Sequence, residues 1–256
     1  MLPYFYIHAY EKGQPEIILD EDNSRHIVQV LRMGAGEPLR LTDGKGALLE
    51  GLILDAHKKK CIVRLQHSEY HPAPERKSCI AISLLKNASR FEWFLEKVTE
   101  IGIATIIPLL CERTEKQHFR QDRMQNILVS AMLQSQQSWL PELRSPAPFI
   151  HTVENAGQQH RFIAHCLEEE RISLADISSA DPGLLAHAPT QGSTAVQQAS
   201  ASDGNDPIIL IGPEGDFSRK EIGLALLHKF LPVTLGKTRL RTETAGIVAA
   251  TLLQVS

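Results

Sequence analysis

Two short apolar segments near the C-terminus each lead into a polar loop that contains glycine. The first segment covers residues 208–211, and the second ends at Leu235 and Gly236. Apolar runs of this length with β-branched residues are typical of buried parallel strands, and a helical pattern follows each loop. Because open α/β sheets bind ligands at the carboxyl ends of their strands, the sequence predicts a ligand site between these loops.

The helices after both loops have recognisable starts. Ser218 and Glu221 match a capping box, in which each side chain satisfies a free backbone donor of the first helical turn. Residues 245–253, after the second loop, are small and apolar, so that helix must be largely buried. Both loops are therefore expected to be held between buried elements.

The pattern of the chain changes near residue 70. Short strand and turn patterns alternate before it, which is typical of a small β-barrel. Two prolines among polar residues at 71–77 indicate a linker, and strand and helix patterns alternate over residues 80–110. We expect a barrel domain over residues 1–70 and an α/β domain with a parallel sheet over residues 78–256.

Two basic loops follow the first two strands of the predicted α/β domain. Arg90 lies in the first loop and Arg113 in the second, and Ser89 with Glu92 matches another capping box. Both strands should end at the same edge of the sheet, which makes this edge a candidate RNA face. A role in capping and solubility alone remains an equal alternative for Arg90.

The formal net charge of −3 gives no sign of a nucleic-acid-binding protein. Residues 168–206, however, hold seven acidic residues and one base, Arg171, so this segment carries −6 and the remainder +3. Only a clustered basic patch would indicate RNA binding, so net charge neither supports nor excludes it. The segment is rich in small and polar residues without a sustained period, and we expect a mobile insertion that is dispensable for folding and activity.

The cysteines and the apolar runs exclude several classes of protein. The four cysteines are scattered, without metal-ligand spacing, so we expect reduced thiols and no metal site. The N-terminus lacks the pattern of a signal peptide, and no run approaches the ~20 apolar residues of a membrane span. We expect a soluble cytoplasmic protein without membrane contact.

The paired loops carry a family signature. It consists of Gly212-Pro213-Glu214-Gly215, Leu235-Gly236 and Leu240-Arg241-Thr242-Glu243-Thr244-Ala245. This signature resembles the C-terminal motif of the RsmE family, SPOUT-class enzymes that methylate N3 of a uridine in 16S ribosomal RNA. Asp216 stands where a second glycine is common in this family, and Asp tolerates left-handed backbone better than most residues.

The resemblance implies a fold, a cofactor and partners. The fold is an α/β SPOUT-type parallel sheet with a trefoil knot, preceded by a small PUA-like β-barrel. S-adenosylmethionine would be the cofactor, the 16S rRNA or the small ribosomal subunit the substrate, and uridine 1498 the target. SPOUT active sites form at a subunit interface, so the resemblance also implies a homodimer.

The resemblance also assigns roles to individual residues. Cofactor contacts map to Gly212, Pro213, Glu214, Gly215, Leu235, Gly236, Leu240 and Thr242. RNA contacts map to Arg25, Arg90, Arg113 and Arg239. His165, at the end of a further predicted strand, is a candidate neighbour of the cofactor, although a structural histidine is at least as good an interpretation.

Two residues are candidates for catalysis. Uracil N3 must lose its proton before it attacks the sulfonium methyl, and this chemistry needs positioning and electrostatics but no metal. Arg241 would orient the uracil or its phosphate, and Glu243 would accept the proton, although Glu243 fits equally well as a helix cap. Ribose 2′-O-methylation by a related SPOUT protein and a noncatalytic RNA-binding module are the alternative functions.

Overall fold

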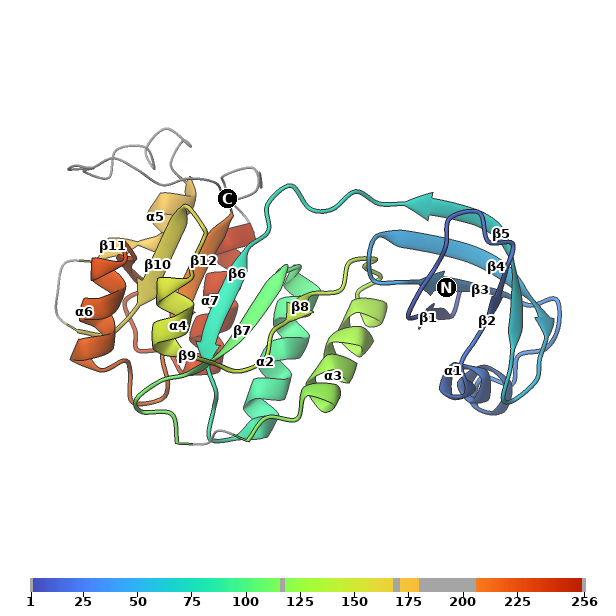
Figure 1. Ribbon diagram of the computed structural model, residues 1–256, viewed down its shortest axis with the longest axis horizontal. Coiled ribbons are helices and arrows are strands. Elements are labelled where there is room, and N and C mark those ends of the chain that lie inside the picture. Colours follow the sequence, from blue (N-terminus) through green and yellow to red (C-terminus); the bar gives the residue numbers. More distant parts are fainter. Residues whose placement is uncertain (1, 116–117, 168–170, 180–205, 255–256) are drawn as a thin grey trace. The chain divides into compact units, whose positions relative to one another are not determined.

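The computed structural model describes residues 2–115, 118–167, 171–179 and 206–254 of the 256-residue chain (Figure 1). The chain divides into two compact units. The first contains Met1–Pro74 and Leu128–Leu140, and the second contains Glu75–Ile127 and Pro141–Ser256. Leu128–Leu140, which the sequence placed in the α/β domain, thus groups with the N-terminal residues.

The first unit is built on a mainly antiparallel sheet. Its strands are β1 (Tyr4–Tyr6), β2 (Glu16–Ile18), β3 (Pro38–Thr42), β4 (Ala47–Asp55) and β5 (Ile62–Tyr70), in the order β1-β3-β4-β5-β2. Only the pair β1 and β3 is parallel. Alternate residues of β4 are buried, because successive side chains of a strand point to opposite faces. The predicted β-rich domain is therefore present.

A short helical segment covers one end of this sheet's core. It consists of α1 (Glu21–Arg25) and the π-helical turn η1 (His26–Val30). Asp20 caps α1 by accepting the Asn23 amide hydrogen bond at 2.8 Å. Ile27 is completely buried and joins the core formed by the inward-facing strand residues.

The second unit contains the predicted parallel sheet. Its strands are β6 (Cys79–Ser83), β7 (Thr105–Leu110), β8 (Glu142–Leu143), β9 (Ala147–Pro148), β10 (His160–Ala164), β11 (Ile172–Ser173), β12 (Pro207–Ile211) and β13 (Leu231–Thr234). They follow the order β11-β13-β10-β12-β6-β7-β8, with β9 beside β7, and each described pair is parallel. This confirms the α/β class, whereas the trefoil knot stays a prediction.

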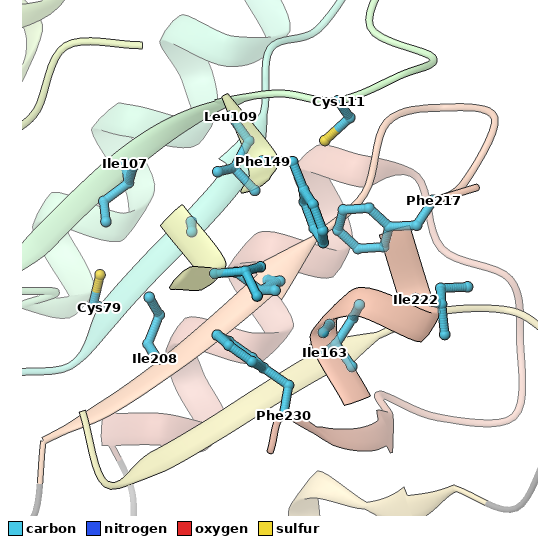
Figure 2. Packing of buried hydrophobic residues seen from close by; sticks show 14 residues of the cluster. Cys79, Ile107, Leu109, Cys111, Phe149, Ile163, Ile208, Phe217, Ile222 and Phe230 are labelled. Carbon is cyan, nitrogen blue, oxygen red and sulfur yellow. The ribbon is translucent and has the colours of Figure 1, made fainter. Parts of the chain in front are cut away.

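Helices cover both faces of this sheet. The helices after β6 are α2 (Ala88–Ile101), α3 (Gln121–Gln134), α4 (Phe149–Glu154), α5 (Leu174–Ser179), α6 (Arg219–Leu227) and α7 (Thr242–Gln254), and the second half of α3 belongs to the first unit. On one face α4 and α6 lie side by side, and their Phe149 and Ile222 belong to the same buried cluster as Ile208 of β12 (Figure 2). On the other face α7 lies against β6, β12 and α2. None of the described helices is long and apolar enough to cross a membrane.

One predicted helix start is confirmed and another is wrong. Ser218 and Glu221 form the predicted capping box of α6. At α2, however, Asn87 is the cap and accepts the Ser89 amide hydrogen bond at 2.9 Å. Glu92 instead pairs with Arg123 at 2.6 Å, because an ion pair between helices competes successfully with the local cap.

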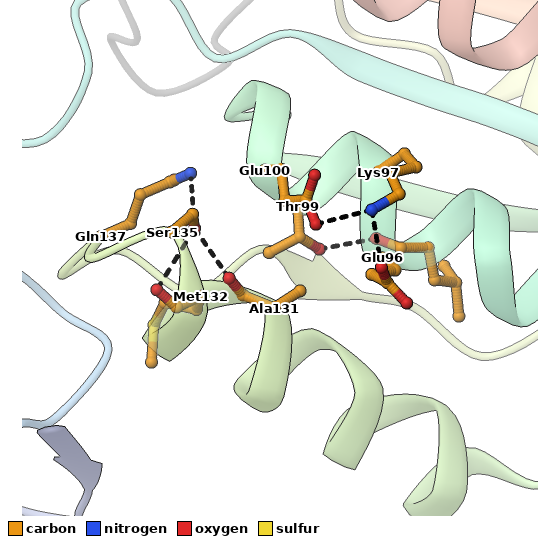
Figure 3. A network of polar contacts seen from close by, with 9 residues as sticks. Glu96, Lys97, Thr99, Glu100, Ala131, Met132, Ser135 and Gln137 are labelled. Carbon is orange, nitrogen blue, oxygen red and sulfur yellow. Dashed lines mark hydrogen bonds and ion pairs between the residues drawn. The ribbon is translucent and has the colours of Figure 1, made fainter. Parts of the chain in front are cut away.

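The polar contacts drawn in Figure 3 lie within α2 or at the C-terminal end of α3. On α2, Lys97 Nζ lies 2.6 Å from Glu96 and 2.9 Å from Glu100. After α3, the Ser135 hydroxyl donates to the Ala131 carbonyl at 2.7 Å, and the same carbonyl accepts the Ser135 amide at 2.9 Å.

Part of the predicted insertion has regular structure. Residues 172–179 form β11 and α5, and β11 pairs with β13. Leu174 is only 1% exposed, and α5 lies beside α7. Strand pairing and burial of Leu174 offset the cost of ordering, and composition alone does not reveal such distant contacts. Residues 168–170 and 180–205, the remainder of the predicted insertion apart from Arg171 and Asp206, lie outside the described residues.

Candidate functional site

A cavity of about 330 Å³ opens at the carboxyl ends of β10, β12 and β13. Its volume lies within the ~300–1,000 Å³ range of small-molecule sites. Both glycine-containing loops and the end of β10 form its wall. The lining residues include Arg90, Ala164, His165, Cys166, Arg171, Ile211, Gly212, Pro213, Glu214, Asp216, Val233, Thr234, Leu235, Gly236, Thr238, Arg239, Leu240, Arg241, Thr242 and Ala245.

The first loop, residues 212–217, is held by its own packing and by Asp216. A Cβ at Gly212 would lie 3.1 Å from the Phe217 backbone nitrogen, so glycine permits the tight return of the loop. Asp216 has φ of 64°, which confirms that an aspartate can replace glycine at this left-handed position. Its carboxylate accepts the Cys166 amide hydrogen bond at 2.8 Å and thereby ties the loop to the end of β10.

The second loop, residues 235–241, leaves open space in the cavity. Gly236 has φ of 144°, in the region that favours glycine, and a Cβ there would meet no atom within 4 Å. The Thr234 hydroxyl donates to the Gly236 carbonyl at 2.9 Å and fixes the start of the loop. The backbone of Gly236 is thus accessible to a ligand from the cavity side.

An ion pair joins the partly exposed Arg90 in the cavity wall to the buried Glu243 behind it. Arg90 Nε is 3.6 Å from Glu243 Oε1, and the Glu243 side chain is 7% exposed while that of Arg90 is 41% exposed. Glu243 Oε2 is buried and has no hydrogen-bond partner among the described residues. Arg90 lines the cavity but Glu243 does not, so the carboxylate reaches a ligand only through Arg90 or after a local movement.

Most of the predicted site residues gather at this cavity. All the predicted cofactor residues line it except Gly215, whose carbonyl instead accepts a hydrogen bond from Arg113 Nη1 at 2.6 Å. Arg241 lines it, as do Arg90 and Arg239 of the predicted RNA contacts. Arg25 belongs to the first unit, where it pairs with Glu21 at 2.9 Å.

The cavity wall also contains His165, which the sequence suggested, and Cys166 and Arg171, which it did not single out. His165 lies in the wall, as the strand pattern suggested for a cofactor neighbour, and the exposed Cys166 follows it. Arg171 was missed because it lies in a segment that resembled an insertion; its Nη1 donates to the His165 carbonyl at 2.5 Å. The sequence signal that could have identified Arg171 is that it is the single basic residue of an acidic stretch. The described residues contain no cluster of three metal-ligating side chains.

Comparisons with known proteins define the class of this site. Residues 72–254 match the model of an RNA methyltransferase domain, and residues 19–66 match that of an RNA methyltransferase PUA domain. The parallel sheet and its cavity are therefore those of an RNA methyltransferase, and the N-terminal sheet is PUA-like. The two matches fall on the parallel-sheet part and on the N-terminal β-sheet part of the fold, respectively.

Individual relatives narrow the class to a family. The chain is 30% identical over 226 residues to ribosomal RNA small subunit methyltransferase E of Synechocystis sp., covering 88% of this chain and 68% of that protein. It belongs to the RsmE family, as the signature predicted.

Solved structures share the fold along nearly the whole chain. A probable rRNA-methyltransferase from Porphyromonas gingivalis has 37% identity and a TM-score of 0.79, covering 97% of this chain and 95% of that chain. A putative methyltransferase from Legionella pneumophila, solved with the bound cofactor SAM, has 28% identity and a TM-score of 0.79, covering 99% and 97%. This protein is therefore a methyltransferase of small-subunit ribosomal RNA.

Proposed function

We propose that this enzyme methylates N3 of a uridine in 16S rRNA, with uridine 1498 as the target by analogy with the family. The observation that carries the proposal is the joint cavity of the two loops, whose wall contains both Arg241 and Gly236. A cation at this position suits an imide that becomes an anion when N3 loses its proton.

S-adenosylmethionine is the methyl donor, and the cavity residues fit it. Its sulfonium supplies an electrophilic methyl group. The open space beside Gly236 allows a ligand to approach the backbone, and Ile211, Val233 and Leu240 give the wall apolar contacts for adenine. The proposed cofactor contacts are Gly212, Pro213, Glu214, Leu235, Gly236, Leu240 and Thr242.

The arginines of the cavity would orient the uracil and stabilise its anion, while the N3 proton would leave to solvent water. Arg241 would donate to a uracil oxygen or to the phosphate of the target nucleotide. Arg90, also in the wall, would stabilise the developing anion, and Glu243 would hold the Arg90 guanidinium in place. Direct proton acceptance by Glu243 is the competing role, and its burial favours the positioning role.

The proposal extends to RNA binding and assembly. Arg113 and Arg239 would contact RNA near the cavity, and Arg25 would contact it from a PUA-like domain at residues 1–70. A linker at 71–77 would join this domain to a knotted SPOUT domain at 78–256. The enzyme would act as a homodimer in the cytoplasm, where ribosomal RNA is available.

Nucleoside analysis tests the reaction. Purified enzyme and S-adenosylmethionine are incubated with unmethylated small subunits or with free 16S rRNA, and the digested RNA is analysed by mass spectrometry. We expect N3-methyluridine, mapped to a single uridine. A ribose-methylated nucleoside would instead support 2′-O-methylation, and cofactor binding without RNA methylation on either substrate would contradict the proposal.

A further inference from the structure

We infer that Glu221 is a positioning residue that fixes the Arg113 loop, residues 111–114, against the first loop of the cavity. The inference rests on the proposed function only in its last step, the contact of Arg113 with RNA. Sequence analysis gave Glu221 the role of a capping residue, and the structure shows that its side chain makes a second, long-range contact.

Both carboxylate oxygens of Glu221 accept backbone hydrogen bonds. Oε2 accepts the Ser218 amide at 2.8 Å, which is the local half of the capping box. Oε1 accepts the amide of Glu112 at 2.8 Å, a residue on the loop after β7. Glu221 is only 8% exposed, so these two donors replace the water that a carboxylate would otherwise bind. Capping requires only one of the two oxygens.

The Arg113 side chain closes a ring of contacts. Glu221 holds the amide of Glu112, and the next residue, Arg113, donates from Nη1 to the Gly215 carbonyl at 2.6 Å. Gly215 is three residues before Ser218, to which Glu221 is bound. A Cβ at Gly215 would lie 3.4 Å from Arg113 Cδ, so the arginine stem crosses directly over this glycine. This contact explains why Gly215 belongs to the first loop without lining the cavity.

The remainder of the Arg113 loop is also fixed. The Thr114 hydroxyl accepts the Cys111 amide hydrogen bond at 2.9 Å and lies 2.9 Å from the Ser83 hydroxyl at the end of β6. Only the tip, Glu112 and Arg113, projects from this base, and both of its residues are exposed. The Glu221 contact and the Arg113–Gly215 bond therefore join this tip to the segment after β12, which lies two strands away from β7 in the sheet.

Fixing the loop tip changes the entropy that the Arg113 guanidinium loses when it binds a phosphate. An arginine on a flexible tip loses side-chain and loop entropy when it binds a phosphate, whereas a tip already fixed has less to lose. Glu221 would thus raise RNA affinity through Arg113 without touching either RNA or cofactor.

Two variants separate this role from capping. Glu221→Gln leaves one acceptor oxygen for two backbone donors. We expect this oxygen to stay on Ser218 within the same helical turn, which directs the amide NH₂ group toward Glu112, where it cannot accept. Ser218→Ala removes the other half of the capping box, the 3.3 Å bond to the Glu221 amide, and leaves the carboxylate on Glu112. We expect Glu221→Gln to raise the KM for RNA by about tenfold with kcat and cofactor Kd nearly unchanged. Ser218→Ala should lower Tm by roughly 2–4 °C and leave the KM for RNA unchanged.

A double variant tests the route through Arg113. If Glu221 acts through this arginine, Glu221→Gln should add little to the KM of an Arg113→Ala enzyme. Full additivity of the two effects, or an equal KM increase in Ser218→Ala, would overturn the inference.

Amide hydrogen exchange tests the contact without RNA. In the cofactor-bound enzyme, exchange at the Glu112 amide should accelerate in Glu221→Gln and stay slow in Ser218→Ala. If Arg113→Ala proves to have normal KM while this exchange pattern holds, the RNA role of Arg113 fails and the positioning contact stands. Unchanged exchange in Glu221→Gln would overturn the positioning contact itself.

Discussion

Arg241 is the residue whose position in the cavity most directly suggests contact with substrate. It is exposed, it lines the cavity, and it immediately precedes α7. Arg241→Ala should preserve cofactor affinity, because the cationic sulfonium repels a guanidinium. The activation free energy of methyl transfer should rise by about 1–3 kcal/mol. Arg241→Lys should recover only part of the lost rate, because the planar guanidinium fork is absent.

Single-turnover methylation and calorimetric titration with S-adenosylmethionine measure the two quantities for Arg241. Arg219→Ala is a suitable control, because Arg219 is also exposed but does not line the cavity. Parallel losses of Tm and cofactor affinity in Arg241→Ala would show instead that the arginine is structural.

The pair of Arg90 and Glu243 gives a second prediction at the residue scale. If Glu243 positions Arg90 across 3.6 Å, Glu243→Gln and Arg90→Ala should slow methyl transfer by similar factors, and the double variant should be no slower than either. If Glu243 accepts the proton directly, Glu243→Gln should be far slower than Arg90→Ala. Rapid-quench measurements of the single and double variants distinguish these outcomes, with melting curves as the control for folding.

The cysteines offer a chemical probe of the cavity. Burial raises the pKa of Cys79 and of Cys111 to about 12, so both thiols stay protonated and unreactive near neutral pH. Cys61 is buried as well, whereas Cys166 is exposed in the cavity wall. Iodoacetamide at pH 8 should therefore label Cys166 alone in the native enzyme.

Saturation with S-adenosylhomocysteine should slow the labelling of Cys166 by up to about a hundredfold when the ligand is present at ~100 times its Kd. Peptide mass spectrometry identifies the labelled residue. Labelling at an undiminished rate would mean that the nucleoside ligand binds elsewhere.

At the scale of elements, the contact of α7 with α2 depends on a single glycine. A Cβ at Gly246 would lie 2.5 Å from Phe94 Cε2 and 3.0 Å from Ile82 Cδ1, and both neighbours are completely buried. Gly246→Ala should therefore force α7 away from α2 and reduce the free energy of unfolding by about 1–3 kcal/mol.

A second helical glycine serves as the control. Gly223 on α6 has no atom within 4 Å of its virtual Cβ, so Gly223→Ala should increase stability by about 0.5–1 kcal/mol through lower unfolded-chain entropy. Urea unfolding measures both variants. Equal stability of the two alanine variants would contradict the close packing of α7, and partial recovery by Phe94→Leu in Gly246→Ala would support it.

At the scale of the whole molecule, the prediction that residues 168–206 are dispensable applies differently to the structured part around β11 and to residues 180–205. Arg171 lines the cavity, β11 pairs with β13, and Leu174 is buried, so their removal should lower both stability and cofactor affinity. Replacement of residues 180–205 by a short Gly-Ser linker should leave methyl transfer within about twofold of the parent, because the polar composition of this stretch offers little surface to bury.

The two deletions are compared by single-turnover methylation and by sedimentation. Removal of residues 168–206 without loss of activity would show that β11 and Arg171 are not required. A monomeric or inactive 180–205 deletion would assign a function to that stretch.

The sequence by itself determined the fold class and most of the cavity. The run of residues 208–211 and the signature after it are local patterns, since strand burial, turn glycines and capping residues depend on neighbours within a few positions. For this reason the parallel sheet, the Ser218–Glu221 capping box and the left-handed Asp216 agree with expectation. Local propensity failed where a distant partner competed, as at Glu92, which pairs with Arg123 instead of capping α2.

Only the tertiary structure decided which distant residues meet. Arg171 in the cavity, Gly215 beneath Arg113 and Glu221 on the Glu112 amide each join segments from different strands. Such contacts follow from the order of strands in the sheet, where β12 lies between β10 and β6 although some forty residues or more of chain separate it from either. No periodicity within one segment encodes that order, because it is set by which apolar faces can be buried together across the whole domain.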